Sequence, residues 1–214
     1  MIFFPKSQKK LEISIAEYTK EGNISEVRRL INSGADINVK DNRFFETAFH
    51  LSCRFNRLEI VKLLINCGFG INTKNNFGET GIYLASFDEY SEIVKLLIIS
   101  GAKLNNISPF GDTVLHFACM DDKLETAKLL LSYGVNVGIR TKDYLSTALH
   151  HACSYGFFEI VKLLINYIID LNITDSEEKT VLQLANKFTN FNVARLITIK
   201  KYTNLPSIYH LDDF

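Results

Sequence analysis

A short sequence pattern recurs along this 214-residue chain at an almost constant interval. Thr-Ala-Leu-His at 147–150 is followed by Glu-Ile-Val-Lys-Leu-Leu-Ile at 159–165. Nearly the same two segments occur at 47–50 and 59–65. The opening threonines are Thr47, Thr80, Thr113, Thr147 and Thr180, separated by 33, 33, 34 and 33 residues. A fixed period of this size is typical of proteins whose repeats stack and bury their apolar faces against their neighbours. The chain is therefore predicted to be a repeat array.

Each repeat is predicted to contain two helices. The threonine can cap the first helix. In the second helix Ile60, Val61, Leu63 and Leu64 form a broad apolar face that a single helix pair cannot bury. A glycine then ends the helix in a left-handed conformation, which costs other residues about 1–2 kcal/mol. These glycines are Gly34, Gly68, Gly101 and Gly134. Ile168 replaces the glycine of the fifth repeat, so we expect an altered turn there.

The period and the Thr-x-x-His start resemble the ankyrin repeat. The resemblance covers roughly residues 8–201 and implies an all-α fold, an ankyrin-repeat solenoid of about six helix–turn–helix units with short hairpin connections. Residues 1–204 are accordingly predicted to form an ankyrin repeat domain. Its repeats are expected at about 6–38, 39–72, 73–105, 106–138, 139–172 and 173–204, and residues 205–214 form a C-terminal tail.

The hairpins depart from the family pattern. Glycine usually stands two residues before the threonine, as Gly78 and Gly111 do, but Phe45, Leu145 and Glu178 replace it in three repeats. The turns that contain Phe45 and Leu145 are also one residue longer. Because a longer turn can relieve the need for a positive φ, we expect Phe44 and Tyr144 in these two turns to point elsewhere than Phe77 and Phe110.

Charge and hydropathy narrow the class of partner. Lysine plus arginine and aspartate plus glutamate both total 24, so the net charge is zero and the basic footprint of a nucleic-acid-binding protein is missing. The apolar runs are far shorter than a membrane-spanning helix, and residues 1–5 do not resemble a secretory signal. We expect a monomeric, intracellular protein of the cytoplasm, with the nucleus as the alternative. Its partners are predicted to be one or more proteins, without nucleic acid and without membrane insertion.

The motif that most resembles a metal-binding or reactive site is His-x-x-Cys. It occurs three times, at His50/Cys53, His116/Cys119 and His150/Cys153. Each pair shares a helix face, but two ligands do not complete a zinc site, and stacked helices lie about 8–10 Å apart. That separation also exceeds the Cα limit of about 7 Å for a disulfide. The resemblance implies a structural, hydrogen-bonding role for the histidines. The four cysteines, including Cys67, are interpreted as reduced, small apolar residues.

His151 occupies a repeat position that is apolar in the other repeats. It is therefore either a pH-sensitive group or a partly solvated core histidine. The sequence contains no phosphate-binding loop, metalloprotease motif or nucleophile–base pair. We therefore predict a protein that is not an enzyme, with no catalytic residues, no cofactor and no bound metal.

The candidate binding positions are those that the fold does not need. They are aromatic residues at the hairpin tips, acidic residues directly before the threonines, and residues on the outward side of the first helices. By resemblance these positions line a concave groove. The predicted partner-binding residues are Phe44, Glu46, Phe55, Phe77, Glu79, Phe87, Phe110, Asp112, Met120, Asp121, Tyr144 and Tyr155. Two alternatives remain open: a compositional bias toward aromatics, and rings that pack on one another to stiffen the hairpins.

The function predicted from these features is a non-catalytic protein–protein interaction module that acts as a scaffold, an inhibitor or an adaptor. A groove of aromatic and acidic residues favours a partly apolar, basic protein segment. One alternative is a substrate adaptor that recruits a second protein through the tail, where Leu-Pro-Ser-Ile at 205–208 resembles the start of an F-box-like motif. An alternative of another class is a zinc- or redox-responsive protein that uses the His-x-x-Cys pairs.

Overall fold

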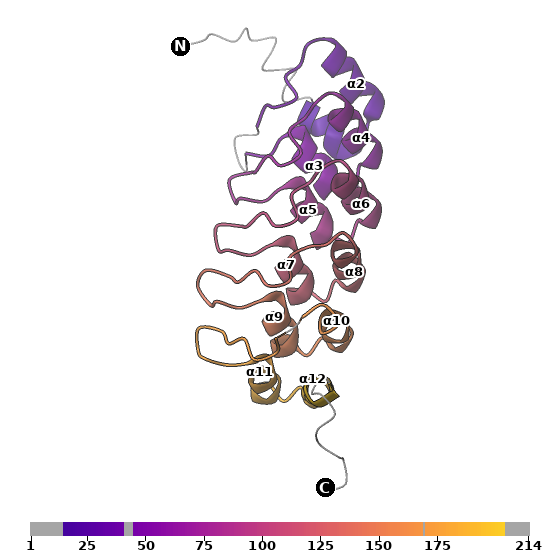
Figure 1. Ribbon diagram of the computed structural model, residues 1–214. Coiled ribbons are helices and arrows are strands. Elements are labelled where there is room, and N and C mark those ends of the chain that lie inside the picture. The colour runs from indigo at the N-terminus through magenta and orange to yellow at the C-terminus, as the bar shows by residue number, and fades with distance from the viewer. Residues whose placement is uncertain (1–14, 41–44, 169, 204–214) are drawn as a thin grey trace, which may run out of the picture. The chain divides into compact units, whose positions relative to one another are not determined.

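The computed structural model describes residues 15–40, 45–168 and 170–203 (Figure 1). The chain divides into two compact units, an N-terminal unit (Met1–Pro109) and a C-terminal unit (Phe110–Phe214). Within the described ranges there is no strand, only an isolated antiparallel bridge between Thr174 and Thr180. The prediction of an all-α repeat fold is confirmed. None of the described helices combines the length and apolar character that crossing a membrane requires.

The N-terminal unit consists of two rows of helices. Residues 15–21 are helical. They are followed by α2 (Ile24–Asn32), α3 (Ala48–Arg54), α4 (Leu58–Asn66), α5 (Gly81–Phe87) and α6 (Ser91–Ile99). The first helices α3 and α5 pack side by side, and the second helices α2, α4 and α6 form a second row next to them, on the right in Figure 1.

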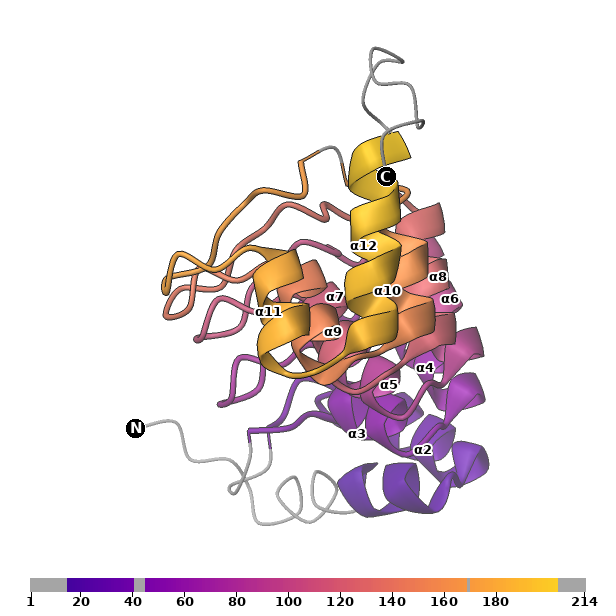
Figure 2. The ribbon, with the colours of Figure 1, turned by 90° about the horizontal axis from the view of Figure 1, so that it is seen from below.

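The C-terminal unit repeats this arrangement. Its helices are α7 (Val114–Met120), α8 (Leu124–Ser132), α9 (Ala148–Tyr155), α10 (Phe158–Leu164), α11 (Val181–Lys187) and α12 (Phe191–Thr203). Figure 2 shows α11 beside α9 and α12 beside α10. The core lies between the two rows. It is built from the apolar face predicted for the second helices, for example Ile160, Val161 and Leu164 of α10, which are all buried.

The Thr-x-x-His start closes the first turn of the first helix and also ties one repeat to the next. The Thr47 N–H donates to His50 Nδ1 (3.3 Å), and the Thr47 hydroxyl lies 2.8 Å from the same atom. Since Nδ1 accepts, the ring proton is on Nε2, which donates to the Thr73 carbonyl of the next hairpin (2.9 Å). His116 and His150 make the same cap and bond to the carbonyls of Ser146 and Ile173.

Two repeats vary this cap. In the sixth repeat Gln183 replaces the histidine, and its Oε1 accepts from the Thr180 N–H at 2.8 Å. In the third repeat Tyr83 stands at this position and Thr80 makes no side-chain cap bond. The threonine caps predicted from the sequence are thus confirmed in four repeats and wrong in one.

The glycine stops behave as predicted. Gly34, Gly68, Gly101 and Gly134 have φ between +75° and +94°. The fifth repeat, which has Ile168 instead, ends its helix early: α10 has 7 residues, whereas α4, α6 and α8 have 9 each. The altered turn is therefore confirmed.

The longer hairpins do not avoid a positive φ, and neither does the sixth-repeat hairpin of ordinary length. Phe45, Leu145 and Glu178 have φ of +54°, +48° and +59°, so all three are left-handed although none is glycine. Each carries the strain, about 1–2 kcal/mol, that a side chain meets in this conformation.

The hairpin closure explains why the added residue does not relieve the turn. In a shorter hairpin the Asn75 N–H donates to the Glu79 carbonyl (3.0 Å), and in a longer one the Thr141 N–H donates to the Ser146 carbonyl (2.9 Å). Both bonds end on the residue directly before the threonine. The added residue is absorbed inside the closed loop, and the left-handed residue before the closure, such as Leu145, keeps its conformation.

Candidate protein-binding surfaces

Aromatic rings are exposed on the hairpin and first-helix side of the N-terminal unit. Phe77 lies in the hairpin before α5, Phe87 is the last residue of α5, and Phe55 follows α3. Their exposed fractions are 53%, 51% and 41%. These three predicted residues therefore lie at the surface of one unit. Phe44 lies outside the described residues.

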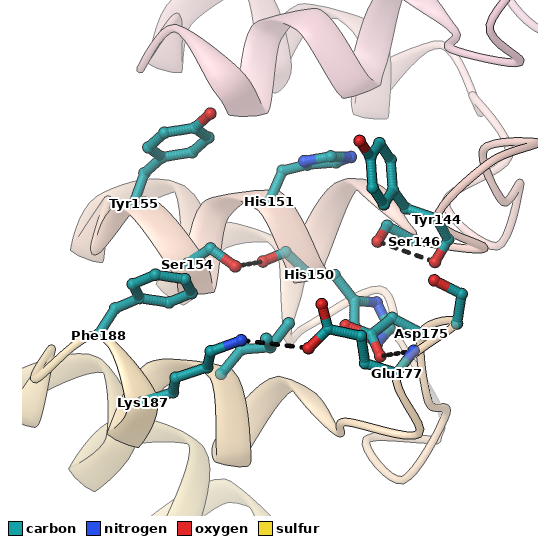
Figure 3. Close-up of a pocket in the computed structure, with 12 residues that line it drawn as sticks. Tyr144, Ser146, His150, His151, Ser154, Tyr155, Asp175, Glu177, Lys187 and Phe188 are labelled. Carbon is teal, nitrogen blue, oxygen red and sulfur yellow. Dashed lines mark hydrogen bonds and ion pairs between the residues drawn. The ribbon is translucent and has the colours of Figure 1, made fainter.

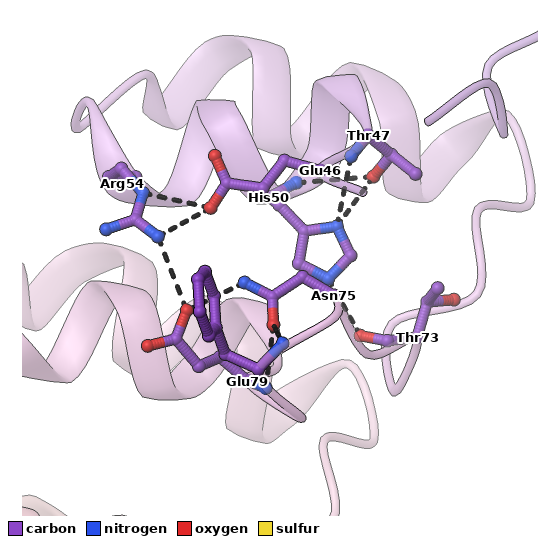
Figure 4. Close-up of polar contacts among 8 residues, drawn as sticks. Glu46, Thr47, His50, Arg54, Thr73, Asn75 and Glu79 are labelled. Carbon is purple, nitrogen blue, oxygen red and sulfur yellow. Dashed lines mark hydrogen bonds and ion pairs between the residues drawn. The ribbon is translucent and has the colours of Figure 1, made fainter. Parts of the chain in front are cut away.

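An arginine that was not among the predicted binding residues, Arg54, joins the acidic positions of this unit (Figure 4). Arg54 Nη2 lies 2.5 Å from Glu46 Oε1 and 3.4 Å from Glu79 Oε2, and Arg54 Nε donates to the same Glu46 oxygen at 3.0 Å. Partial burial opposes the charge of Arg54, but the bond to Glu46 and the carboxylates of Glu79 and Asp88 raise its pKa overall. Arg54 thus links two successive repeats electrostatically.

This arrangement changes the interpretation of Glu46. Its side chain is only 3% exposed, so Glu46 holds Arg54 in place and offers little surface to a partner. Glu79 is more accessible and is itself positioned by Asn75, whose amide donates to Glu79 Oε2 at 2.7 Å. Glu46 precedes the Thr47 cap and lies outside α3, whereas Arg54 is the last residue of that helix, so helical periodicity does not predict their pairing.

The C-terminal unit contains a hollow of about 400 Å³ between the fifth and sixth repeats (Figure 3). Tyr144 enters it from the hairpin before α9, Tyr155 from the end of α9, and Phe188 from the residue after α11. These rings are 66%, 56% and 48% exposed. The structure therefore brings together two predicted residues, Tyr144 and Tyr155. Phe188 was missed, although it occupies the same repeat position as Phe55 and Tyr155.

Charged side chains lie on the sixth-repeat side of the hollow. Lys187 Nζ is 3.1 Å from Glu177 Oε2 and 5.6 Å from the ring centroid of Phe188. Asp175 Oδ1 accepts from the backbone N–H groups of Glu177 and Lys179, both at 2.9 Å, and so shapes the hairpin that presents Glu177.

His151 forms part of the wall of the hollow. Its ring meets that of His116 edge-on, with centroids 5.9 Å apart, and its Nε2 is buried without a hydrogen-bond partner. Burial lowers the pKa of His151, with the Asp112 carboxylate opposing the shift, so the imidazole is neutral at pH 7. Burial, assisted by His151, lowers the pKa of His116 to about 4.

Comparison with known proteins agrees with this architecture. A family model described as ankyrin repeats (three copies) matches residues 15–108, 82–175 and 115–206. The chain belongs to the ankyrin repeat family. No curated protein matches it. Among solved structures it is similar to a chain from the complex of the predatory endopeptidase Bd0816 from Bdellovibrio bacteriovorus with the immunity protein Bd3460. The identity is 25% over 87% of this chain and 97% of that chain, with a TM-score of 0.76.

The remaining predicted residues of this ankyrin repeat protein lie on the fourth repeat. Phe110 is 67% exposed in the hairpin before α7, and Asp121 is exposed directly after that helix. Asp112 and Met120 are half-buried. None of these four lines the hollow of the fifth and sixth repeats. They therefore stay a separate prediction.

The His-x-x-Cys pairs are used by the fold. Both ring nitrogens of each of the three capping histidines are engaged in hydrogen bonds, which leaves no nitrogen lone pair for a metal. Burial raises the pKa values of Cys53, Cys119 and Cys153 and disfavours their thiolates. Cys67 is free as well but exposed, so unlike the other three cysteines it is not part of the apolar interior. Across the described ranges, no group of three or more His, Cys, Asp or Glu side chains is arranged to hold a metal ion.

Proposed function

We propose that this ankyrin repeat protein is a non-catalytic recognition module that holds a partner protein against its hairpins and first helices. The observation that carries the proposal is the exposure of aromatic rings at recurring positions on this side of each unit. Exposed fractions range from 41% to 67% for Phe55, Phe77, Phe87, Phe110, Tyr144 and Tyr155. The similar solved chain comes from a complex between two proteins, which supports the same kind of use.

In the N-terminal unit, the distribution of exposed rings argues against composition as their only cause. In the described part of the N-terminal unit, the exposed phenylalanines and tyrosines are Phe45, Phe55, Phe77 and Phe87. All four lie in hairpins or at the ends of first helices, and none lies on α2, α4 or α6. A compositional bias alone would place rings on both rows, as it does in the C-terminal unit, where Phe158 of α10 and Phe191 and Tyr202 of α12 are also exposed. Aromatic side chains supply a large contact area at small entropic cost, which is why they are enriched in interfaces.

The charges near these rings favour a partner with basic side chains. Arg54 is surrounded by the carboxylates of Glu46, Glu79 and Asp88, so this cluster has a net negative charge. A negative surface attracts positively charged segments and disfavours acidic ones. A scaffold, an inhibitor and an adaptor can all use such a surface, and they differ in what the bound partner then does.

Affinity capture from the native cell lysate tests the proposal. The variants are the pairs Phe77→Ala with Phe87→Ala and Tyr144→Ala with Tyr155→Ala. Phe191→Ala is the matched control, because Phe191 is 71% exposed but lies on the second-helix row. We expect each pair to reduce the retained partner by about tenfold or more, as loss of interface hot spots does, with an unchanged helical circular dichroism spectrum.

Two outcomes would contradict the proposal. One is unchanged capture by both paired variants, and the other is an equal loss in the Phe191→Ala control. The alternative adaptor function is tested by deleting 205–214, a segment outside the described residues. The proposed surface predicts intact capture by the truncated chain, whereas loss of capture would favour the tail.

A further inference from the structure

We propose that the hollow between the fifth and sixth repeats is a subsite for one arginine or lysine side chain of the partner polypeptide. The inference rests on the proposed function, because it assigns the chemistry of a segment that the recognition surface holds. It concerns only the C-terminal unit, which contains all the residues that line the hollow.

The size of the hollow suits a side chain. Its volume of about 400 Å³ is near the lower end of the range for ligand pockets, about 300–1,000 Å³, so it accommodates a single long side chain. Rings stand around it on two repeats: Tyr144 and Tyr155 from the fifth and Phe188 from the sixth (Figure 3). The faces of aromatic rings carry partial negative charge and attract ammonium and guanidinium groups.

The charged groups of the hollow have the complementary sign. Asp175 and Glu177 contribute two carboxylates, and Lys187 contributes one ammonium group. The imidazoles of His150 and His151 are neutral at pH 7, since burial lowers both pKa values. The lining therefore has a net charge of −1 when it is empty. A partner cation neutralises this charge, whereas a partner carboxylate increases it.

The protein's own Lys187 already shows how a cation is held. Its ammonium group pairs with Glu177 and lies over the face of Phe188, the two interactions that a partner cation would make. The pair is easily displaced, because 49% of the Lys187 side chain and 62% of the Glu177 side chain are exposed, and exposed pairs contribute little free energy. Lys187 is thus a tethered competitor for the partner cation, and an arginine, which binds carboxylates with two parallel bonds, would replace it best.

This competition can be tested, because it predicts opposite changes in peptide affinity for substitutions of Glu177 and Lys187. Three blocked alanine pentapeptides with arginine, leucine or glutamate at the centre are titrated into the full-length protein, and binding is followed by NMR shifts of the tyrosine and phenylalanine rings. We expect the arginine peptide to bind most tightly and to shift Tyr144, Tyr155 and Phe188. Glu177→Gln should weaken its binding by about threefold, and Lys187→Met should tighten it by about threefold.

A matched control uses the exposed pair Lys162–Glu159 on α10, in which both side chains are 59% exposed. Lys162→Met removes the same charge from the other helical row and should leave peptide binding unchanged. An equal gain in this control would mean that net charge alone, and not the hollow, controls affinity, and would overturn the proposal.

Three further results would overturn the subsite. In the first, the glutamate peptide binds more tightly than the arginine peptide and Lys187→Met weakens its binding. In the second, the leucine peptide binds as tightly as the arginine peptide. In the third, the NMR shifts are confined to residues outside the hollow. These failures are distinguishable from failure of the proposed function. If the arginine peptide misses the hollow while the paired aromatic variants still lose lysate capture, only the subsite is wrong. If the arginine peptide binds there while both paired variants retain capture, the recognition surface is wrong.

Discussion

Replacing His116 by glutamine is expected to make the protein more resistant to acid. His116 is 1% exposed, and burial, assisted by His151, lowers its pKa from 6.5 to about 4, with Asp112 and the Ser146 carbonyl opposing the shift. The folded protein therefore takes up this proton less readily than the unfolded chain. The resulting stability is fully present above pH 6.5, declines as the pH falls below 6.5, and is lost as the pH falls through about 4.

The magnitude follows from the two pKa values. A shift from 6.5 to about 4 corresponds to about 3 kcal/mol in total, of which about 2 kcal/mol is lost at pH 5 relative to pH 8. Glutamine keeps the helix cap without titrating, as Gln183 shows with its 2.8 Å bond from the Thr180 N–H. At pH 8 His116→Gln should lower the free energy of unfolding by about 1 kcal/mol, because the hydrogen bond to the Ser146 carbonyl is lost.

Urea unfolding followed by circular dichroism at pH 8 and pH 5 measures the effect. Between pH 8 and pH 5, the free energy of unfolding of the wild type should fall by about 2 kcal/mol more than that of His116→Gln. His50 and His150, whose pKa values burial also lowers, are present in both proteins and cancel in the comparison. The contact between His116 and His151 is part of the difference that is measured. Gln183→His is the control. Because position 183 is exposed, a histidine there stays hydrated and should not add to the loss of stability between pH 8 and pH 5. Equal losses in wild type and His116→Gln would refute the reasoning.

Two other predictions concern the hairpins and the cysteines. Glu178 is exposed and left-handed, so Glu178→Gly should raise the free energy of unfolding by about 1 kcal/mol in urea. Gly111→Ala, at the same repeat position, should lower it by about 2 kcal/mol or more, because φ is +89° and the new Cβ would lie 2.6 Å from the Lys142 nitrogen. Equal effects of the two substitutions would contradict this account. Alkylation of the native protein, measured by mass spectrometry, should modify Cys67 alone among the four cysteines. Alkylation of a second cysteine before the protein unfolds would contradict the burial of the other three.

The helices could be predicted from the sequence because their determinants are local and periodic. The apolar face of each second helix and the glycine after it recur at fixed positions, so one repeat predicts the next. Even the exception at Ile168 could be recognised, because a missing glycine removes a specific left-handed stop.

The hairpins could not be predicted as well, because loop length does not determine where a loop bends. Leu145 is left-handed although its turn has an added residue, since the closing bond from the Thr141 N–H to the Ser146 carbonyl fixes the chain on both sides. That bond joins residues within the loop whose pairing is not apparent from composition. The strain at Leu145 is therefore visible only once the closure is known.

The binding surfaces show a further reason why repeat positions cannot be interpreted one at a time. Seven residues after the threonine stand Arg54 in the second repeat and Lys187 in the sixth, and each pairs with a hairpin carboxylate, Glu46 or Glu177. In the third repeat the same position holds Phe87, which is exposed and apolar. The charge that a hairpin carboxylate offers to a partner is therefore set by the residue at the end of the first helix. An acidic position gives a negative surface where carboxylates outnumber the cations of their own chain, as around Arg54, or where, as we infer for Lys187, that cation can be displaced.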